Sequence, residues 1–262
     1  STLLRFDEAA CEICSKLPIQ PFTKNTAAKY TREVLNRLGR TLPESEIDRI
    51  IAHPKSRNPT FLKAIVGELA VFGSHQGLSR RITELLAAEE VEDLFEILLN
   101  RLEQDLGLEA VKRPLEILAL TYPHGLHTQD LPDISGCAPR DFAFLNLELE
   151  TAFYENGERI HIAHEYLHKA VEARYLSDAQ KRRARSREFG LWYLRPDREP
   201  HFRFFALRPL CEAEAWADLK SALTEPEVYA TPIGNASEYY DFWARVADAD
   251  FSRSTEDCIE TN

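Results

Sequence analysis

Hydrophobic residues recur at helical spacing through most of the first ninety positions of the chain. The stretch 26–38 places apolar residues on one face, and Gly39 follows where the end of a helix favours glycine. Another stretch opens with Pro43 and two acidic residues, as the first turn of a helix prefers. Further helices are predicted over 7–17, 61–72 and 78–88. The pattern therefore predicts an all-helical unit over residues 1–90.

The most apolar of these helices opens with Asn58-Pro59. Its apolar residues form one helical stripe that we expect to be buried: Phe61, Leu62, Ile65, Val66 and Leu69. A proline at the first helical position fits a simple helix cap. The rigid ring of Pro59 can also offer a flat apolar contact to a planar ligand, and spacing alone does not separate the two interpretations.

From residue 91 the pattern changes to helices followed by a hairpin. The elements expected are helices over 91–105 and 108–120, a short helical turn over 126–131, a helix over 139–150, extended runs over 151–154 and 159–163, and a helix over 164–176. Asn156-Gly157 between the two extended runs is a strong hairpin signal. This order of elements is typical of a winged helix, which we predict over residues 91–176.

Residues 177–262 are predicted to form a further helical domain, rich in aromatic side chains and interrupted by prolines. They contain a basic run at 181–187. Such a run is usually a solvated helix face, and this interpretation is favoured over a binding patch. The predicted fold class is therefore mostly α, with one small β-hairpin.

The composition is that of a folded, water-soluble protein. Of the 262 residues, 44% are hydrophobic and 29% are charged. There are 32 basic and 43 acidic residues, so the net charge is −11. A chain with this charge repels a phosphate backbone, and nucleic acid is a poor default partner. The sequence has no methionine and opens with Ser-Thr, so we expect it to continue a longer chain.

Cysteine usage and hydropathy predict a cytoplasmic protein. The five cysteines are odd in number and scattered, which fits reduced thiols. No run approaches the ~18 apolar residues that a membrane-spanning helix needs, and no export signal is recognisable at the N-terminus. We therefore expect no membrane partner.

The sequence shows no catalytic constellation. It lacks the phosphate-binding pattern G-x-x-x-x-G-K-[ST], the nucleophile elbow G-x-S-x-G and the dinucleotide pattern G-x-G-x-x-G. Cys11 and Cys14 form a lone C-x-x-C pair. A four-ligand zinc site needs a second pair at matching spacing, so structural cysteines are the favoured interpretation.

Three histidines, His161, His164 and His168, lie at spacing that can bring imidazoles onto one helix face. Three imidazoles can hold a catalytic zinc ion. However, His161 falls in the predicted strand, before the helix begins, and we expect no metal site. His164 is the more informative residue, because a helix N-terminus offers free N–H groups and a positive dipole end to phosphate.

Several segments carry a family resemblance in the same order along the chain. They are NPTFLKA (58–64), ELAVFG (68–73), RLEQDLG (101–107), HGL (124–126), AHEYL (163–167), AVEARYL (170–176) and EYYDFW (238–243). The series resembles the region after the nucleotide-binding core in NACHT-type STAND ATPases, of the nephrocystin-like and telomerase-associated-protein-like kind. The resemblance covers most of the 262 residues.

The resemblance implies a domain order and a partner core. Residues 1–90 would be a helical lid, residues 91–176 a winged helix, and residues 177–262 the start of a second helical domain. A P-loop core that binds ADP or ATP with Mg would precede them in the parent chain. The resemblance implies that the partners of this chain are that core, other protomers in an activated homo-oligomer, and effector and sensor domains. It implies a role in signalling or defence.

Two site residues follow from the resemblance. Pro59 matches the lid proline that packs on the adenine. His164 matches the histidine that reaches the β-phosphate of bound ADP and holds the resting state closed. Ala163 and Glu165 stand where Met and Asp are common in the family, which puts the helix-capping role of that Asp in doubt.

Two functions of other classes remain open. One is a helical scaffold or adaptor without a nucleotide role. The other is a winged-helix DNA-binding regulator that would read the groove with the helix over 139–150. That helix carries Arg140 against Asp141, Glu148 and Glu150, a net charge of −2. A groove-reading helix needs the opposite sign, so the sequence argues against DNA binding.

Overall fold

The computed structural model describes the chain over residues 20–72, 77–149, 152–230 and 236–260. Its contacts form two compact units, residues 1–86 (unit 1) and residues 87–262 (unit 2), and each is described by itself. The described chain is mostly helical with one small antiparallel sheet, as the sequence predicts. The helix expected over 7–17, with Cys11 and Cys14, lies outside the described residues.

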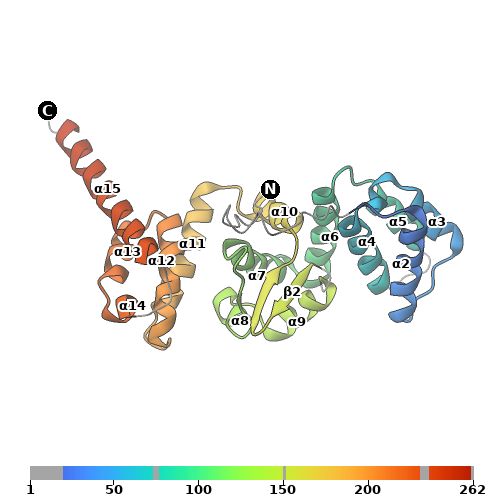
Figure 1. Ribbon diagram of the computed structural model, residues 1–262, viewed down its shortest axis with the longest axis horizontal. Helices are drawn as coiled ribbons and strands as arrows, with labels where there is room; N and C mark the ends of the chain where they lie inside the picture. The colour runs from blue at the N-terminus through green and yellow to red at the C-terminus, as the bar shows by residue number, and fades with distance from the viewer. Residues whose placement is uncertain (1–19, 73–76, 150–151, 231–235, 261–262) are drawn as a thin grey trace, which may run out of the picture. The chain divides into compact units, whose positions relative to one another are not determined.

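Unit 1 is a group of packed helices, coloured blue to cyan in Figure 1. Its elements are α2 (Lys24–Arg37), α3 (Glu44–Ala52), the 3-10 helix η1 (Pro54–Arg57), α4 (Pro59–Val71) and α5 (Leu78–Leu86). The Thr23 hydroxyl caps α2 by accepting the N–H of Thr26 at 3.1 Å. Gly39 follows the helix with φ +68°, so the predicted glycine terminator is confirmed.

Helix α4 carries the core of unit 1. The predicted apolar stripe is confirmed, with exposures of at most 2%: Phe61, Leu62, Ile65, Val66 and Leu69. Beside it the Arg81 guanidinium of α5 donates two hydrogen bonds to Glu68 Oε1 of α4, at 2.8 and 3.0 Å. Both residues are buried. Because a buried charge requires a partner, this pair fixes the position of α5 against α4.

Unit 2 begins with helices that enclose a small sheet. Its first elements are α6 (Val91–Leu106), α7 (Leu108–Leu120), β1 (Leu126–His127), α8 (Asp130–Ser135), α9 (Pro139–Glu148), β2 (Phe153–Asn156), β3 (Arg159–Ile162) and α10 (Glu165–Tyr175). Helices α6, α7 and α10 pack against one another. Arg101 of α6 donates to Glu148 of α9 at 2.6 Å, which ties α9 to the same group.

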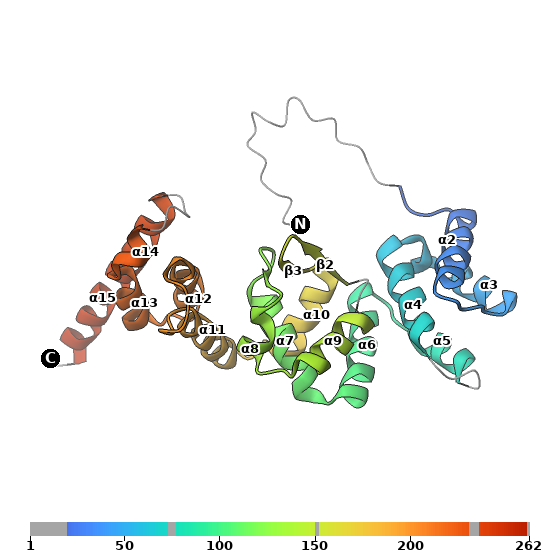
Figure 2. The ribbon, with the colours of Figure 1, turned by 90° about the horizontal axis from the view of Figure 1, so that it is seen from below.

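The sheet is built on the predicted hairpin. Strands β2 and β3 pair antiparallel, with Asn156 opposite Arg159, and Gly157 adopts φ +64° in the turn (Figure 2). Strand β1 pairs with the other edge of β3, so the strand order is β1-β3-β2. The helical turn expected at the start of 126–131 is therefore wrong. Gly125 at φ +64° redirects the chain, and Leu126 pairs with Ile160 as strand.

The rest of unit 2 is helical and runs from gold to red in Figure 1. Its elements are α11 (Ala179–Tyr193), the 3-10 helix η2 (Pro200–Ala206), α12 (Leu207–Glu212), α13 (Trp216–Leu223), α14 (Pro226–Ala230) and α15 (Ala236–Glu260). A Cβ on Gly190 would lie 2.7 Å from Leu210, so the glycine permits close packing of α11 on α12. Among the described residues, no helix has both the length and the apolar character to span a membrane.

Candidate functional site

His164 lies at the junction of strand β3 and helix α10. It is the N-cap residue, with φ −134° and ψ 133°, and its side chain is half-buried and does not cap the helix. The preceding Ala163 donates its N–H to the carbonyl of Ala152 at 2.8 Å, which continues the hairpin up to the cap. The structure therefore places His164 at the helix start that the sequence predicts.

The other two histidines of the triplet have separate environments. His161 of β3 is buried, stacks on Tyr154 with ring centres 4.6 Å apart, and its Nδ1 lies 3.2 Å from the carbonyl oxygen of Pro123. His168 of α10 stacks on Tyr122 at 4.3 Å, and burial lowers the pKa of its imidazole. Within the described part of the chain, no group of three His, Cys, Asp or Glu residues could hold a metal ion.

Pro59 is the first residue of helix α4 in unit 1, and it is exposed. The cap itself is made by Asn58, whose Oδ1 accepts the N–H of Thr60 at 2.8 Å and that of Phe61 at 3.4 Å. The proline ring therefore has no part in capping beyond its preset φ. Its exposure leaves the ring accessible to a contact from outside the unit.

The basic run of α11 is paired along its whole length. Each of its five cations lies within ion-pair distance of a carboxylate: Lys181 with Asp178, Arg182 with Glu172, Arg183 with Glu214, Arg185 with Glu116, and Arg187 with Asp218. The partners belong to α7, α10 and α13 and to the segments before α11 and after α12. The run is therefore a paired helix face, as favoured from the sequence.

Helix α9 presents apolar side chains and one cation, Arg140, to solvent. Phe144 is 43% exposed and Leu147 is 59% exposed, while the Arg140 guanidinium lies 5.6 Å from the centre of the Phe144 ring. Glu148 is occupied by its ion pair with Arg101. The exposed part of α9 is therefore mainly apolar.

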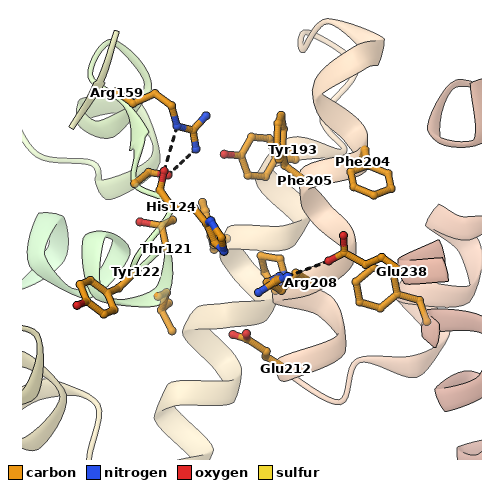
Figure 3. Close-up of a pocket in the computed structure, with 15 residues that line it drawn as sticks. Thr121, Tyr122, His124, Arg159, Tyr193, Phe204, Phe205, Arg208, Glu212 and Glu238 are labelled. Carbon is orange, nitrogen blue, oxygen red and sulfur yellow. Dashed lines mark hydrogen bonds and ion pairs between the residues drawn. The ribbon is translucent and has the colours of Figure 1, made fainter. Parts of the chain in front are cut away.

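A cavity of about 420 Å³ lies within unit 2 and was not predicted from the sequence. One side comes from the turn that follows α7, including Thr121 and His124, and from Arg159 of β3. The other side comes from α11, η2, α12 and α15 (Figure 3). Its lining residues are scattered from position 120 to position 242, so only the fold reveals that they meet.

The charged groups of this cavity are held by specific contacts. Arg159 donates to the carbonyl oxygens of His124 and Gly125, at 3.1 and 2.6 Å. Arg208 donates to Glu238 at 2.8 Å. Burial lowers the pKa of the His124 imidazole, with the positive charges of Arg208 and Arg159 acting in the same direction. His124 is therefore neutral near pH 7.

Glu212 also lines the cavity. The surrounding protein raises the pKa of its carboxyl, although the side chain keeps contact with solvent, and Arg208 opposes that rise. Burial therefore favours the neutral form of the Glu212 carboxyl.

Among known proteins, this chain is similar to a small part of a repeat protein. No family model matches the chain, and no solved structure matches it. A TPR repeat-containing protein of Dictyostelium discoideum is 26% identical over 166 residues, which is 62% of this chain. The match covers 10% of that protein, so the chain spans about a tenth of the relative's length.

Proposed function

We propose that this chain is the regulatory portion of a STAND-type nucleotide switch. A P-loop core in the parent chain would bind ADP or ATP with Mg, and this portion would close over ADP. Exchange of ADP for ATP would release this portion from the core and permit oligomerisation. Unit 1 would serve as the helical lid, and residues 91–176 as a winged helix.

The order of elements supports the winged helix. Helix α7, strand β1, helices α8 and α9, and the β2–β3 hairpin follow one another, and the strand order is β1-β3-β2. A winged helix joins three helices to a small sheet in this arrangement, with the hairpin after the third helix. Helix α10 then leaves the hairpin directly, and its first turn is the region where the family resemblance places a phosphate contact.

His164 is the observation that carries the proposal. It occupies the N-cap of α10 after β3, at the position where an imidazole can donate a hydrogen bond to a phosphate near the helix N-terminus. Glu165, where the family often has Asp, forms an ion pair with Lys169 at 2.8 Å. The Glu165 carboxylate is thus paired along the helix, and the phosphate contact would come from the histidine and the backbone N–H groups.

Pro59 of unit 1 is placed where the same resemblance would need it. Its exposed ring at the start of α4 is available to an adenine, because Asn58 already provides the cap. A proline ring presents a flat apolar face with no rotamer to fix, which suits contact with a planar base.

The test is ADP binding by calorimetry, using the chain extended at its N-terminus to include the P-loop core. His164→Ala is expected to weaken ADP binding about ten- to a hundredfold, because a charge-assisted hydrogen bond contributes ~1.5–3 kcal/mol. His168→Ala, one turn later on the same helix, is the control and is expected to retain ADP affinity. Unchanged affinity in the His164 variant would refute its assignment to the phosphate.

A helical scaffold is the second candidate. The Dictyostelium relative is named for TPR repeats, which are stacked helical pairs. The same calorimetric experiment separates the two candidates. Failure of the extended chain to bind either ADP or ATP would favour the scaffold, because a scaffold needs no nucleotide.

A further inference from the structure

We propose that the cavity in unit 2 is a binding site for a small planar aromatic acid. This inference is independent of the nucleotide switch, because the residues that line the cavity include neither His164 nor Pro59. It rests on the size of the cavity, on the aromatic rings that line it, and on the hydrogen-bond donors that two arginines bring to it.

The cavity has the size and character of a small-molecule site. Its volume of about 420 Å³ falls within the range of ~300–1,000 Å³ usual for ligand pockets. Its walls are mainly apolar, and a few polar groups converge on it. Such a combination allows apolar contact to supply affinity and polar contact to fix orientation.

Aromatic rings form one wall. Tyr193 of α11 is buried, and its ring centre lies 5.8 Å from that of Phe205 in η2. Phe204 and Phe205 are only half-buried, so part of each side chain remains accessible. Figure 3 shows these three rings on the same side of the cavity. Rings held in this way favour a flat aromatic ligand, through offset or edge contacts.

Two arginines give the site its preference for an anion. Arg159 donates from its Nε and Nη2 atoms to backbone carbonyls, and it forms no ion pair with a carboxylate of the described residues. Its charge is therefore not neutralised locally. Arg208 uses Nη2 on Glu238, which leaves other N–H groups of the guanidinium for a ligand.

Arg159 also contacts the aromatic wall directly. Its guanidinium carbon lies 5.8 Å from the centre of the Phe205 ring. The positive charge and the aromatic surface thus occur side by side, and one small molecule can contact both. A carboxylate attached to a planar ring matches this pair of features.

A cationic ligand fits the cavity less well. Glu238 already accepts a hydrogen bond from Arg208, and Glu212 lies at the mouth. A cationic ligand would have to lie close to the positive charges of Arg159 and Arg208, which would repel it. The lining carries the carboxylates of Glu212 and Glu238 beside the two guanidinium groups, so the preference for an anion rests on Arg159, which hydrogen-bonds only to backbone carbonyls.

Binding in this cavity would link two parts of unit 2. Thr121, His124 and Arg159 belong to the part that contains the sheet, whereas Phe205 and Arg208 belong to the helices that follow α11. A ligand that contacts both groups stabilises their observed arrangement, because it binds only when both are in place.

The test is calorimetric titration of the 262-residue chain with 2-naphthoate, and with neutral 2-naphthamide as the matched ligand. We expect one site per chain and at least about tenfold tighter binding of the acid, because only the acid gains charge-assisted contacts. Arg208→Gln is expected to weaken binding of the acid at least about tenfold, and Arg208→Lys to recover part of that loss. Arg187→Gln, the same charge change outside the cavity, is expected to leave binding unchanged.

Arg208 suits this test because its side chain is exposed and its removal leaves the core intact. Phe205→Leu is a second variant. It is expected to weaken binding of the acid and of the amide to the same extent, because both lose contact with the ring. Equal affinities for acid and amide, no binding of 2-naphthoate at millimolar concentration, or full affinity in Arg208→Gln would each overturn the proposal.

Discussion

Arg174→Met is the variant that best tests how helix α10, with His164 at its start, is held in place. In the native protein, Arg174 donates to both carboxylate oxygens of Glu103, at 2.8 and 2.6 Å. It also donates to Glu96 at 2.7 Å and to Asn100 at 2.6 Å. All three acceptors are on α6, so one side chain joins α10 to α6 through four hydrogen bonds.

The expected loss follows from burial. The Arg174 side chain is 22% exposed and that of Glu103 is 16% exposed. The pair is thus intermediate between exposed ion pairs, worth about 0–1 kcal/mol, and buried ones, whose disruption costs about 3–5 kcal/mol. We expect a loss of about 2–3 kcal/mol in the free energy of unfolding. For a unit of this length, each kcal/mol lowers Tm by about 2–4 °C, so the expected fall is about 4–12 °C.

The assay is thermal unfolding followed by circular dichroism across pH. Arg174 is the largest cause of the lowered pKa of Glu103 in the folded state. That carboxylate therefore contributes stability above its unfolded pKa of about 4.3, and the contribution is lost as pH falls through the lower folded pKa. The difference in Tm between native and variant protein is expected to be largest near pH 7 and to shrink below about pH 4.

Arg187→Met is the control, because it removes one exposed ion pair from α11. Exposed pairs contribute little, so its Tm is expected to stay close to that of the native protein. If Arg174→Met lowered Tm no more than Arg187→Met does, or if the difference in Tm were independent of pH, the reasoning would be wrong.

Three further experiments test the packing. Leu69→Ala is expected to destabilise unit 1 by about 2–5 kcal/mol in denaturant titration, and a loss below about 1 kcal/mol would contradict its burial. Arg81→Met is expected to cost about 3–5 kcal/mol, and Glu68→Leu in the same chain to recover most of it in a double-mutant cycle. Gly125→Ala should lower Tm more than Gly157→Ala: both glycines have φ +64°, but only at Gly125 would a Cβ meet a β3 carbonyl, at 2.4 Å.

Local sequence patterns were sufficient to predict those elements whose structure is decided by residues close together in the chain. Helix α7 has the predicted bounds, 108–120, because its apolar spacing is regular and Gly107 at φ +91° separates it from α6. The Asn156-Gly157 turn located the hairpin, although β2 begins at Phe153 rather than at 151. In both cases the signal lies within a few residues of the element.

The features that the sequence did not predict depend on contacts between residues far apart in the chain. Strand β1 has two residues, too few for a periodic signal, and it exists because Leu126 pairs with Ile160, 34 positions later. Arg159 looked like an ordinary strand residue, and its placement beside Phe205 follows only from packing of η2 against the sheet region. Long-range pairing of this kind overrides local propensity.

The paired charges of α11 have a mechanical consequence. At about 100° per residue, Arg182 and Arg185 lie on one stripe of the helix, and Arg183 and Arg187 lie on another about 150° away. The first stripe pairs with α10 and α7, while the second pairs with α13 and with Glu214, two residues after α12. A rotation of α11 about its own axis would therefore strain the ion pairs of both stripes at once. Because added salt screens exposed charges, with a screening length of ~10 Å at 0.1 M, the ion pairs are expected to hold the orientation of α11 less firmly as ionic strength rises.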